Sequence, residues 1–156
     1  MTSSQDGPGQ QPVDAGLGVP LQPNAVSANY TANFAQQVQA QVQQSADLKA
    51  AATSGKFSIN PEAAQEMIKA YQFAQQEWLD GQREVDLVAE KYQLGSTPGA
   101  KVISNWNQQV GQQFAMAYMS LRDVYQNQID AYTQAMKNYQ ENEAKVSDSL
   151  RKAGES

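Results

Sequence analysis

Gly95-Ser96-Thr97-Pro98-Gly99 separates two long amphipathic stretches of this 156-residue chain, residues 60–93 and residues 100–152. Glycine and proline commonly mark turns and helix ends, so Gly95, Pro98 and Gly99 predict a hairpin turn between two helices. At 1.5 Å per residue, a helix over residues 61–93 would be about 50 Å long and one over residues 100–152 about 80 Å. In an antiparallel hairpin, about twenty residues of the longer helix, from about residue 134, would then have no partner within the pair.

The first long helix has a clear start signal. Asn60 can accept a hydrogen bond from a free backbone N–H of the first turn, and Pro61 suits the first helical position. Glu62 adds a negative charge near the positive end of the helix dipole. These three residues predict that the helix begins at Pro61.

Both long stretches carry apolar or small residues at spacings of three and four, which is typical of helices packed lengthwise on other helices. Gly81 costs about 1 kcal/mol of helix propensity, and we expect a close approach by the facing helix in return. The first stripe is Ala64, Met67, Tyr71, Ala74, Trp78, Gly81, Val85, Val88 and Tyr92. The second, on which Glu143 is the one charged residue, is Ile103, Trp106, Val110, Phe114, Tyr118, Leu121, Tyr125, Ile129, Tyr132, Met136, Tyr139, Val146 and Leu150.

A third helical segment precedes the hairpin, within residues 24–55. Apolar residues recur every four positions at Tyr30, Phe34, Val38 and Val42, which predicts a helix over residues 27–53 that Gly55 ends. We expect it to turn back at residues 54–56 and to cover part of the overhang or the flank of the hairpin. Residues 1–23, rich in Gly, Pro, Gln and Ser, are expected to be disordered. The predicted fold is all-α and bundle-like, with the hairpin domain over residues 56–153.

Several aromatic residues are candidates for packing or for an interface. Trp78 and Trp106 occupy stripe positions on opposite helices, where we expect them to meet as core anchors. A tyrosine has an apolar ring and a hydroxyl group that needs a partner, which suits a half-buried seam or a protein interface. The other candidates are Met136 and the tyrosines that recur every seven residues, Tyr118, Tyr125, Tyr132 and Tyr139.

The composition argues against an enzyme. The chain contains no cysteine and no histidine, so it lacks a thiol nucleophile, a Ser-His arrangement and the commonest zinc ligand. Carboxylates do occur along both long helices, but helical carboxylate metal sites also use histidine, so a solvated face is the better interpretation. We therefore expect no catalytic residue, no cofactor and no metal site. The carboxylates in question are Glu77, Asp80, Glu84, Asp123 and Asp130.

The charge pattern favours a protein partner over other partners. The formal net charge is -5, and the eleven Lys and Arg are scattered among sixteen acids, which argues against nucleic acid and against direct membrane binding. No stretch approaches the roughly 20 apolar residues that span a bilayer, and the first residues do not resemble a secretory signal peptide. We expect a homodimer or a pairing with another helical protein.

Two motifs are similar to those of a known group of proteins. Residues 57–62, Phe-Ser-Ile-Asn-Pro-Glu, are similar to an apolar-x-apolar-Asp/Asn-Pro-Glu opening of helical hairpins. Tyr139-Gln140-Glu141-Asn142-Glu143 matches a Tyr-x-x-x-Asp/Glu motif late in the second helix. Together, over about residues 57–152, the chain resembles the substrates of type VII (ESX) secretion, which include the WxG-type and PE proteins and associated helical proteins of actinobacteria.

The resemblance implies a non-enzymatic protein that is made in the cytoplasm and exported in the folded state, without a signal peptide, to the cell surface or the medium. It implies that Tyr139 and Glu143 are the secretion signal and that a secretion ATPase is a partner. The chain departs from the named subfamilies, because the turn lacks a WxG tripeptide and Pro61-Glu62 is not near the N-terminus. The main alternative is a cytosolic coiled-coil adaptor or structural subunit that docks a partner helix, in which Tyr139 and Glu143 are an ordinary i, i+4 pair.

Overall fold

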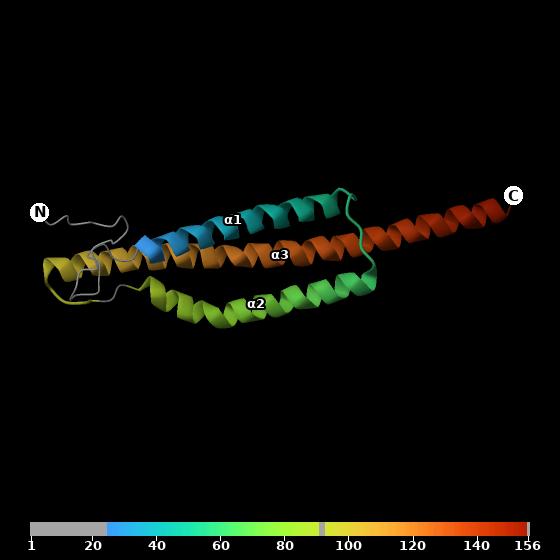
Figure 1. The fold of residues 1–156 in the computed structure, drawn as a ribbon. Coiled ribbons are helices and arrows are strands. Elements are labelled where there is room, and N and C mark those ends of the chain that lie inside the picture. Colours follow the sequence, from blue (N-terminus) through green and yellow to red (C-terminus); the bar gives the residue numbers. More distant parts are fainter. Residues whose placement is uncertain (1–24, 91–92, 156) are drawn as a thin grey trace, which may run out of the picture.

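The computed structural model describes residues 25–90 and 93–155, which form three α-helices (Figure 1). Helix α1 spans Ala25–Thr53, α2 spans Pro61–Ala89 and α3 spans Pro98–Gly154. The all-α prediction is confirmed for this part of the chain. The expected disorder of residues 1–23 and the stripe position of Tyr92 lie outside the described residues.

Helix α3 is the central element, and α1 and α2 both pack along it (Figure 1). Trp78 lies beside Tyr118, and Tyr71 beside Tyr132, so α2 runs antiparallel to α3. Phe34 stacks on Phe114 near the start of α1, and the end of α1 lies near residues 131–138, so α1 runs parallel to α3. Within the described residues, no Cα atom of α1 comes within 8 Å of one of α2. Two separate helix pairs therefore share α3.

The start of each long helix follows from a capping side chain and a proline. The Asn60 Oδ1 atom accepts a hydrogen bond from the Glu62 backbone N–H at 2.8 Å, and α2 begins at Pro61. Thr97 Oγ1 accepts one from the Ala100 backbone N–H at 3.2 Å, and α3 begins at Pro98, two residues earlier than expected. Thr97-Pro98 thus repeats the cap and proline pattern of Asn60-Pro61, although Pro98 was predicted to lie in the turn.

Glycine has a positive φ at two positions, and one of them ends a helix. Gly55 has φ +77°, its N–H donates to the Ala52 carbonyl at 3.1 Å, and the Lys56 N–H donates to the Ala51 carbonyl at 2.9 Å. This is a Schellman motif, which ends α1 at Thr53. Gly95, with φ +126°, lies in the connection between α2 and α3 and also has a backbone conformation that favours glycine.

The expected end of α2 at residue 93 is wrong, because the helix ends at Ala89 and Glu90 is extended. At this end of α2, the apolar side chains of its stripe are poorly packed. Val88 remains 47 % exposed, so further turns would bury little apolar surface to hold the helix together.

The closest helix contacts are made by small residues. The buried residues of α1 recur every seven positions, and they begin at Thr31; Tyr30, which was expected on the packed side, is 72 % exposed. The large stripe residues of α3 from Ile103 to Tyr139 are only half-buried, because each flanking helix covers one side of the stripe. The buried residues are Thr31, Val38, Ser45 and Ala52 in α1, Ala64, Trp78 and Val85 in α2, and Ser104, Gly111, Ala117, Val124, Ala131, Ala135 and Asn138 in α3.

Two glycines allow α2 and α3 to approach. A Cβ atom on Gly81 would lie 2.5 Å from the Tyr118 hydroxyl oxygen, so the approach expected at Gly81 is made by a side chain. A Cβ atom on Gly111 would overlap the carbonyl oxygen of Val88. The approach of one backbone to the other therefore occurs at Gly111.

Trp78 is anchored by Tyr118 and does not meet Trp106, so that expectation is wrong. Trp78 Nε1 donates to the Tyr118 carbonyl and the Tyr118 hydroxyl donates to the Trp78 carbonyl, both at 2.8 Å. The two rings are stacked with centroids 5.8 Å apart, and burial raises the pKa of Tyr118. Residues 106 and 118 are twelve positions apart, about 18 Å along the helix, so Trp106 lies too near the turn. It lines a groove of about 370 Å³ together with Val88 and Phe114.

Candidate functional site

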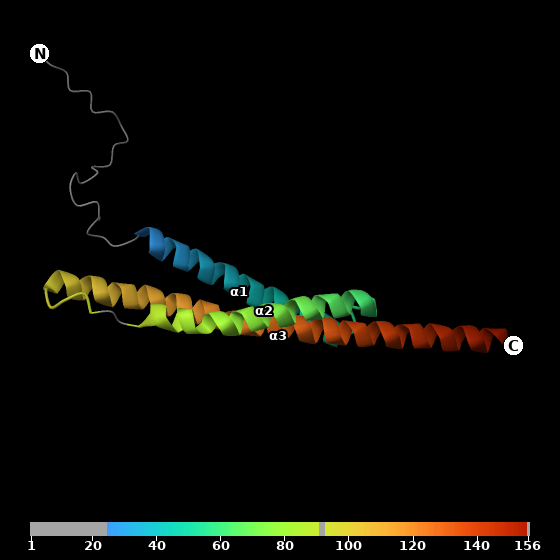
Figure 2. The same ribbon diagram turned by 90° about the horizontal axis from the view of Figure 1, so that it is seen from below.

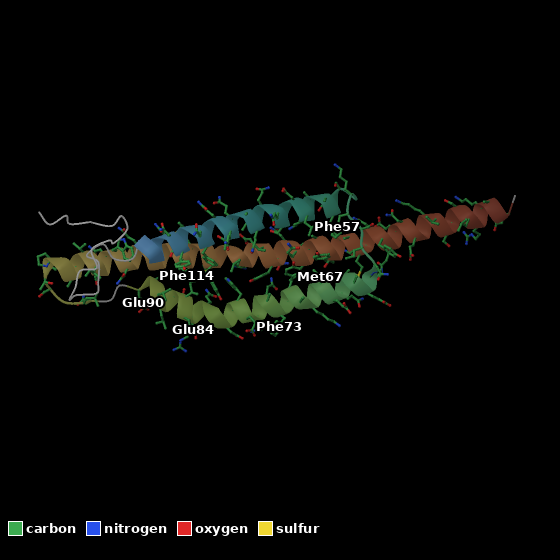
Figure 3. All side chains as sticks on the ribbon, in the orientation of Figure 1. Phe57, Met67, Phe73, Glu84, Glu90 and Phe114 are labelled. Atoms are coloured by element: carbon green, nitrogen blue, oxygen red, sulfur yellow. The ribbon has the colours of Figure 1, made fainter. Side chains whose placement is uncertain are left out.

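The linker between α1 and α2, residues 54–60, crosses α3 and determines where the uncovered part of α3 begins (Figure 1). The Ile59 N–H donates to the Ala135 carbonyl at 3.3 Å. Phe57 lies where the linker passes α3, and its ring contacts Tyr132 edge-on at 5.7 Å between centroids (Figure 3). Ala135 is fully buried beneath this crossing.

Asn138 holds the linker in place. Its Nδ2 atom donates to the carbonyl of Ala52 at 2.7 Å and to that of Phe57 at 2.8 Å, while its Oδ1 accepts from Gln134 Nε2 at 3.0 Å. Both hydrogens of the amide are therefore used, and the residue is only 9 % exposed. Asn138 was not among the predicted site residues, although it continues the seven-residue row of Ala117, Val124 and Ala131.

Polar contacts also fix the C-terminal half of α1 against α3. Lys49 Nζ lies 2.8 Å from Asp130 Oδ2, and Asp130 accepts a second hydrogen bond from Gln126 at 2.9 Å. The hydrogen bond from Lys49 lowers the pKa of Asp130. Asn127 Nδ2 donates to the buried Ser45 Oγ at 3.4 Å. These contacts align α1 with the part of α3 that precedes Asn138.

The overhang begins several residues after the expected position of about 134, because the linker contacts Ala135 and Asn138. Beyond this crossing α3 continues alone (Figure 1), and residues 141–155 are all exposed. We call residues 139–154 the overhang. Of the two positions expected for α1, the overhang or the flank of the hairpin, α1 has the flank, since it ends beside Asn138.

Tyr139 and Glu143 come together at the start of the overhang. Glu143 lies one helical turn after Tyr139, and the interaction of its carboxylate with the Tyr139 hydroxyl raises the pKa of Tyr139. A shallow groove of about 960 Å³ runs along this face, lined among others by Ser58, Tyr139, Glu143, Val146 and Leu150. Val146 is 59 % exposed and Leu150 69 % exposed, so the apolar stripe continues without cover.

No protein-family model, curated protein or solved structure matches this chain. A functional assignment therefore depends on the chain's own residues. Among the helices of the described part, none is long and apolar enough to cross a membrane.

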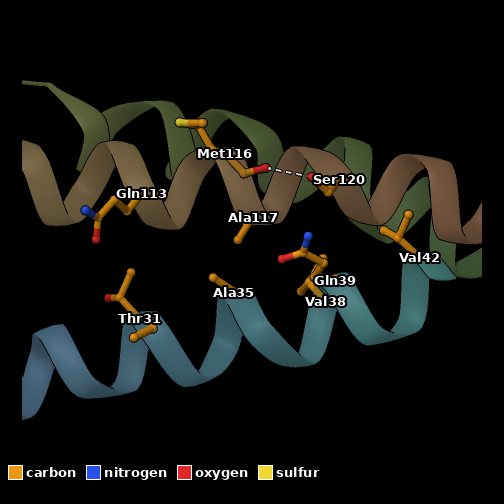
Figure 4. A pocket seen from close by; sticks show the side chains of 10 residues that line it. Thr31, Ala35, Val38, Gln39, Val42, Gln113, Met116, Ala117 and Ser120 are labelled. Carbon is orange, nitrogen blue, oxygen red and sulfur yellow. Dashed lines mark hydrogen bonds between the residues drawn. The ribbon is translucent and has the colours of Figure 1, made fainter.

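A second groove, of about 470 Å³, lies between α1 and α3 (Figure 4). It opens where the N-terminal half of α1 diverges from α3 (Figure 2). Thr31, Ala35 and Val38 face Met116 and Ala117 across it, and its lining carries no charged group. It contains none of the predicted motif residues and lies about 35 Å along α3 from the overhang.

The other predicted interface residues lie along the packed part of α3. Tyr132 stacks on Tyr71 with ring centroids 6.0 Å apart, and burial raises its pKa. Tyr125 and Met136 are half-buried on the same helix. Gly99, predicted in the turn, lies in the first turn of α3 in open space.

The carboxylates considered for a metal site are dispersed. Asp130 is paired with Lys49, and Asp80 accepts a hydrogen bond from Gln76 at 3.1 Å. Within the described ranges, no three His, Cys, Asp or Glu residues are grouped so that they could hold a metal ion.

Proposed function

We propose that this chain is a non-enzymatic helical protein exported by a type VII (ESX) system, with Tyr139 and Glu143 as its secretion signal. In this proposal α2 and α3 form the helical hairpin, and α1 packs along its flank. The secretion machinery recognises the overhang. The observation that supports it is the position of the Tyr139–Glu143 pair, which lies where the linker crossing ends and the exposed part of α3 begins.

The chemistry of the overhang suits recognition by a helix-binding groove. An amphipathic helix is commonly read through anchors at spacings such as i, i+4 and i+7. Tyr139, Val146 and Leu150 provide an aromatic ring and two aliphatic side chains on one stripe, and Glu143 adds a charge beside them. Because Asn138 fixes the linker just before this stripe, the signal can be read while the helices before it remain folded.

Replacing Tyr139 with alanine should stop export and leave folding intact. Tyr139 is half-buried beside the linker crossing, so its replacement should cost only about 1 kcal/mol of stability. The measurement is the fraction of the protein in the culture filtrate of a host with a type VII system, with a cytosolic marker to exclude lysis. Lys145→Ala, on the same exposed helix, is the matched control and should be exported normally. Normal export of the Tyr139 variant would refute the signal.

The alternative is a cytosolic coiled-coil adaptor whose overhang docks a partner helix. The exposed Val146 and Leu150 favour it, because an uncovered apolar stripe on a helix is also typical of coiled-coil pairing. The two functions differ in location: only the exported protein accumulates in culture filtrate without lysis.

A further inference from the structure

We infer that residues 17–21 of this chain bind, as an extended segment, in the groove between α1 and α3 (Figure 4). These residues precede α1 and lie outside the described residues, so their pattern is taken from the sequence. The groove lies far from the overhang, and this docking does not depend on export. Either proposal can therefore fail without the other.

The groove has the chemistry of a docking site for an apolar segment. Its lining carries no charged group, and Val38 and Ala117 within it are buried, whereas Met116 is 72 % exposed. Along α1 it extends from Thr31 to Val42, which is about 17 Å. An apolar segment placed here would cover Met116 and fill the space that opens as the two helices diverge (Figure 2).

The sequence before α1 has the pattern that such a groove requires. Residues 13–21 read Val-Asp-Ala-Gly-Leu-Gly-Val-Pro-Leu, so every second residue is apolar. In an extended chain alternate side chains point to the same side, which brings Leu17, Val19 and Leu21 together on one face. Gly18 has no side chain to hold the backbone away from the helices, and Pro20 favours an extended conformation at the residue before it.

The spacing of these three side chains matches that of the groove. Two residues of an extended chain advance about 6.6 Å, and four residues of a helix advance about 6 Å. With Leu21 beside Thr31, Val19 therefore lies beside Ala35, and Leu17 lies between Val38 and Val42. The residues that α1 contributes at steps of three and four are Thr31, Ala35, Val38 and Val42.

The connection to α1 determines which segment occupies the groove. The four peptide units from Leu21 to Ala25 span at most about 14 Å. Thr31 lies about 9 Å along α1 from Ala25, so the connection can turn back and still move sideways by about 10 Å. The covalent tether holds the segment near the groove at an effective concentration in about the millimolar range. This favours residues 17–21 over a separate protein of equal intrinsic affinity.

Polar side chains at the groove suit an extended backbone. Each residue of such a backbone, proline apart, presents one N–H and one carbonyl group that need partners. Gln39 projects from α1 and Gln113 from α3 toward the groove (Figure 4). A glutamine amide both donates and accepts hydrogen bonds, so these two side chains can bind the main chain of the segment.

Two pairs of introduced cysteines test the docking in the full chain, which has no cysteine of its own. Val19→Cys with Ala35→Cys places both thiols in the groove. Val19→Cys with Gln37→Cys is the matched control, because residue 37 is exposed and lies about 200° around α1 from residue 35. The two loops are nearly equal in length, so a segment that does not dock would close both about equally well.

The measurement is the effective concentration of each thiol pair in a glutathione buffer. The Ala35 pair should exceed the Gln37 pair by about tenfold or more, because a disulfide requires Cα atoms within about 7 Å of each other. In concentrated urea this difference should disappear. Equal values in the folded protein would overturn the inference. So would disulfides that form mainly between two copies, because the segment would then occupy the groove of another chain.

Amide hydrogen exchange provides a second test that needs no cysteine. Combining Leu17→Ser, Val19→Ser and Leu21→Ser should make exchange in residues 31–42 about tenfold faster, because the N-terminal half of α1 loses apolar contacts. The matched control combines Gln5→Ser, Gln10→Ser and Gln11→Ser, which lie before the segment and should leave exchange unchanged. Unchanged exchange in the first variant, or equal acceleration in both, would overturn the inference.

Discussion

Replacing Gly111 with alanine should lower the free energy of unfolding by about 3 kcal/mol, because the new methyl group overlaps the Val88 carbonyl oxygen. The obstacle is backbone, which cannot rotate away as a side chain can. The helices α2 and α3 must therefore separate at this crossing, and the separation also loosens the contacts of Trp78 and Tyr118.

Urea denaturation followed by circular dichroism measures this loss. Gly99→Ala is the matched control, since Gly99 lies in the first turn of the same helix and a Cβ atom there meets no atom within 4 Å. The control should be neutral or stabilising by up to about 1 kcal/mol, because alanine has the higher helix propensity. Equal stabilities of the two variants would show that α2 and α3 do not cross closely at Gly111.

Replacing Asn138 with leucine should cost about 3 kcal/mol of stability, because the carbonyl groups of Ala52 and Phe57 lose their donor at a site that is closed to water. Amide hydrogen exchange should also become faster in residues 54–60, since the linker is released from α3.

Asn142→Leu is the matched control for Asn138→Leu. Asn142 is one turn further along α3 and exposed, so its replacement should change the unfolding free energy by about 0.5 kcal/mol or less. A linker whose exchange is unchanged in the Asn138 variant would contradict the role given to this residue.

The helix boundaries could be predicted where a local signal decides them. Asn60-Pro61 and Gly55 act through hydrogen bonds and backbone conformation within a few residues, and both ends lie where the sequence predicts. Thr97-Pro98 carries the same local signal and could have been recognised. The end of α2 could not, because the stripe continues in sequence after the packing surface has ended.

The contacts between helices were harder to predict, because the spacing of apolar residues mainly identifies large side chains. Ser45, Ala52, Gly111 and Ala131 are buried because small side chains let helices approach, a property that hydrophobic spacing does not display. The alignment of α1 along α3 could not be predicted from the sequence either, since it depends on contacts between distant residues such as Lys49 and Asp130.

The candidate site combines a local and a distant feature. The Tyr139–Glu143 pair follows from a spacing of four on one helix, and the sequence contains it directly. The boundary of the overhang depends on Asn138 and on the path of the linker, which only the folded chain shows. Fold-back length alone placed that boundary too early.

Export of a shortened chain tests the central claim most directly. A chain ending at Gln140 keeps Asn138 and the linker contacts but lacks Glu143, Val146 and Leu150. In a host with a type VII system, the complete chain should accumulate in the culture filtrate, while the shortened chain should remain in the cells with its helical circular dichroism largely preserved. Equal fractions of both chains in the filtrate, with no cytosolic marker released, would contradict the proposed function.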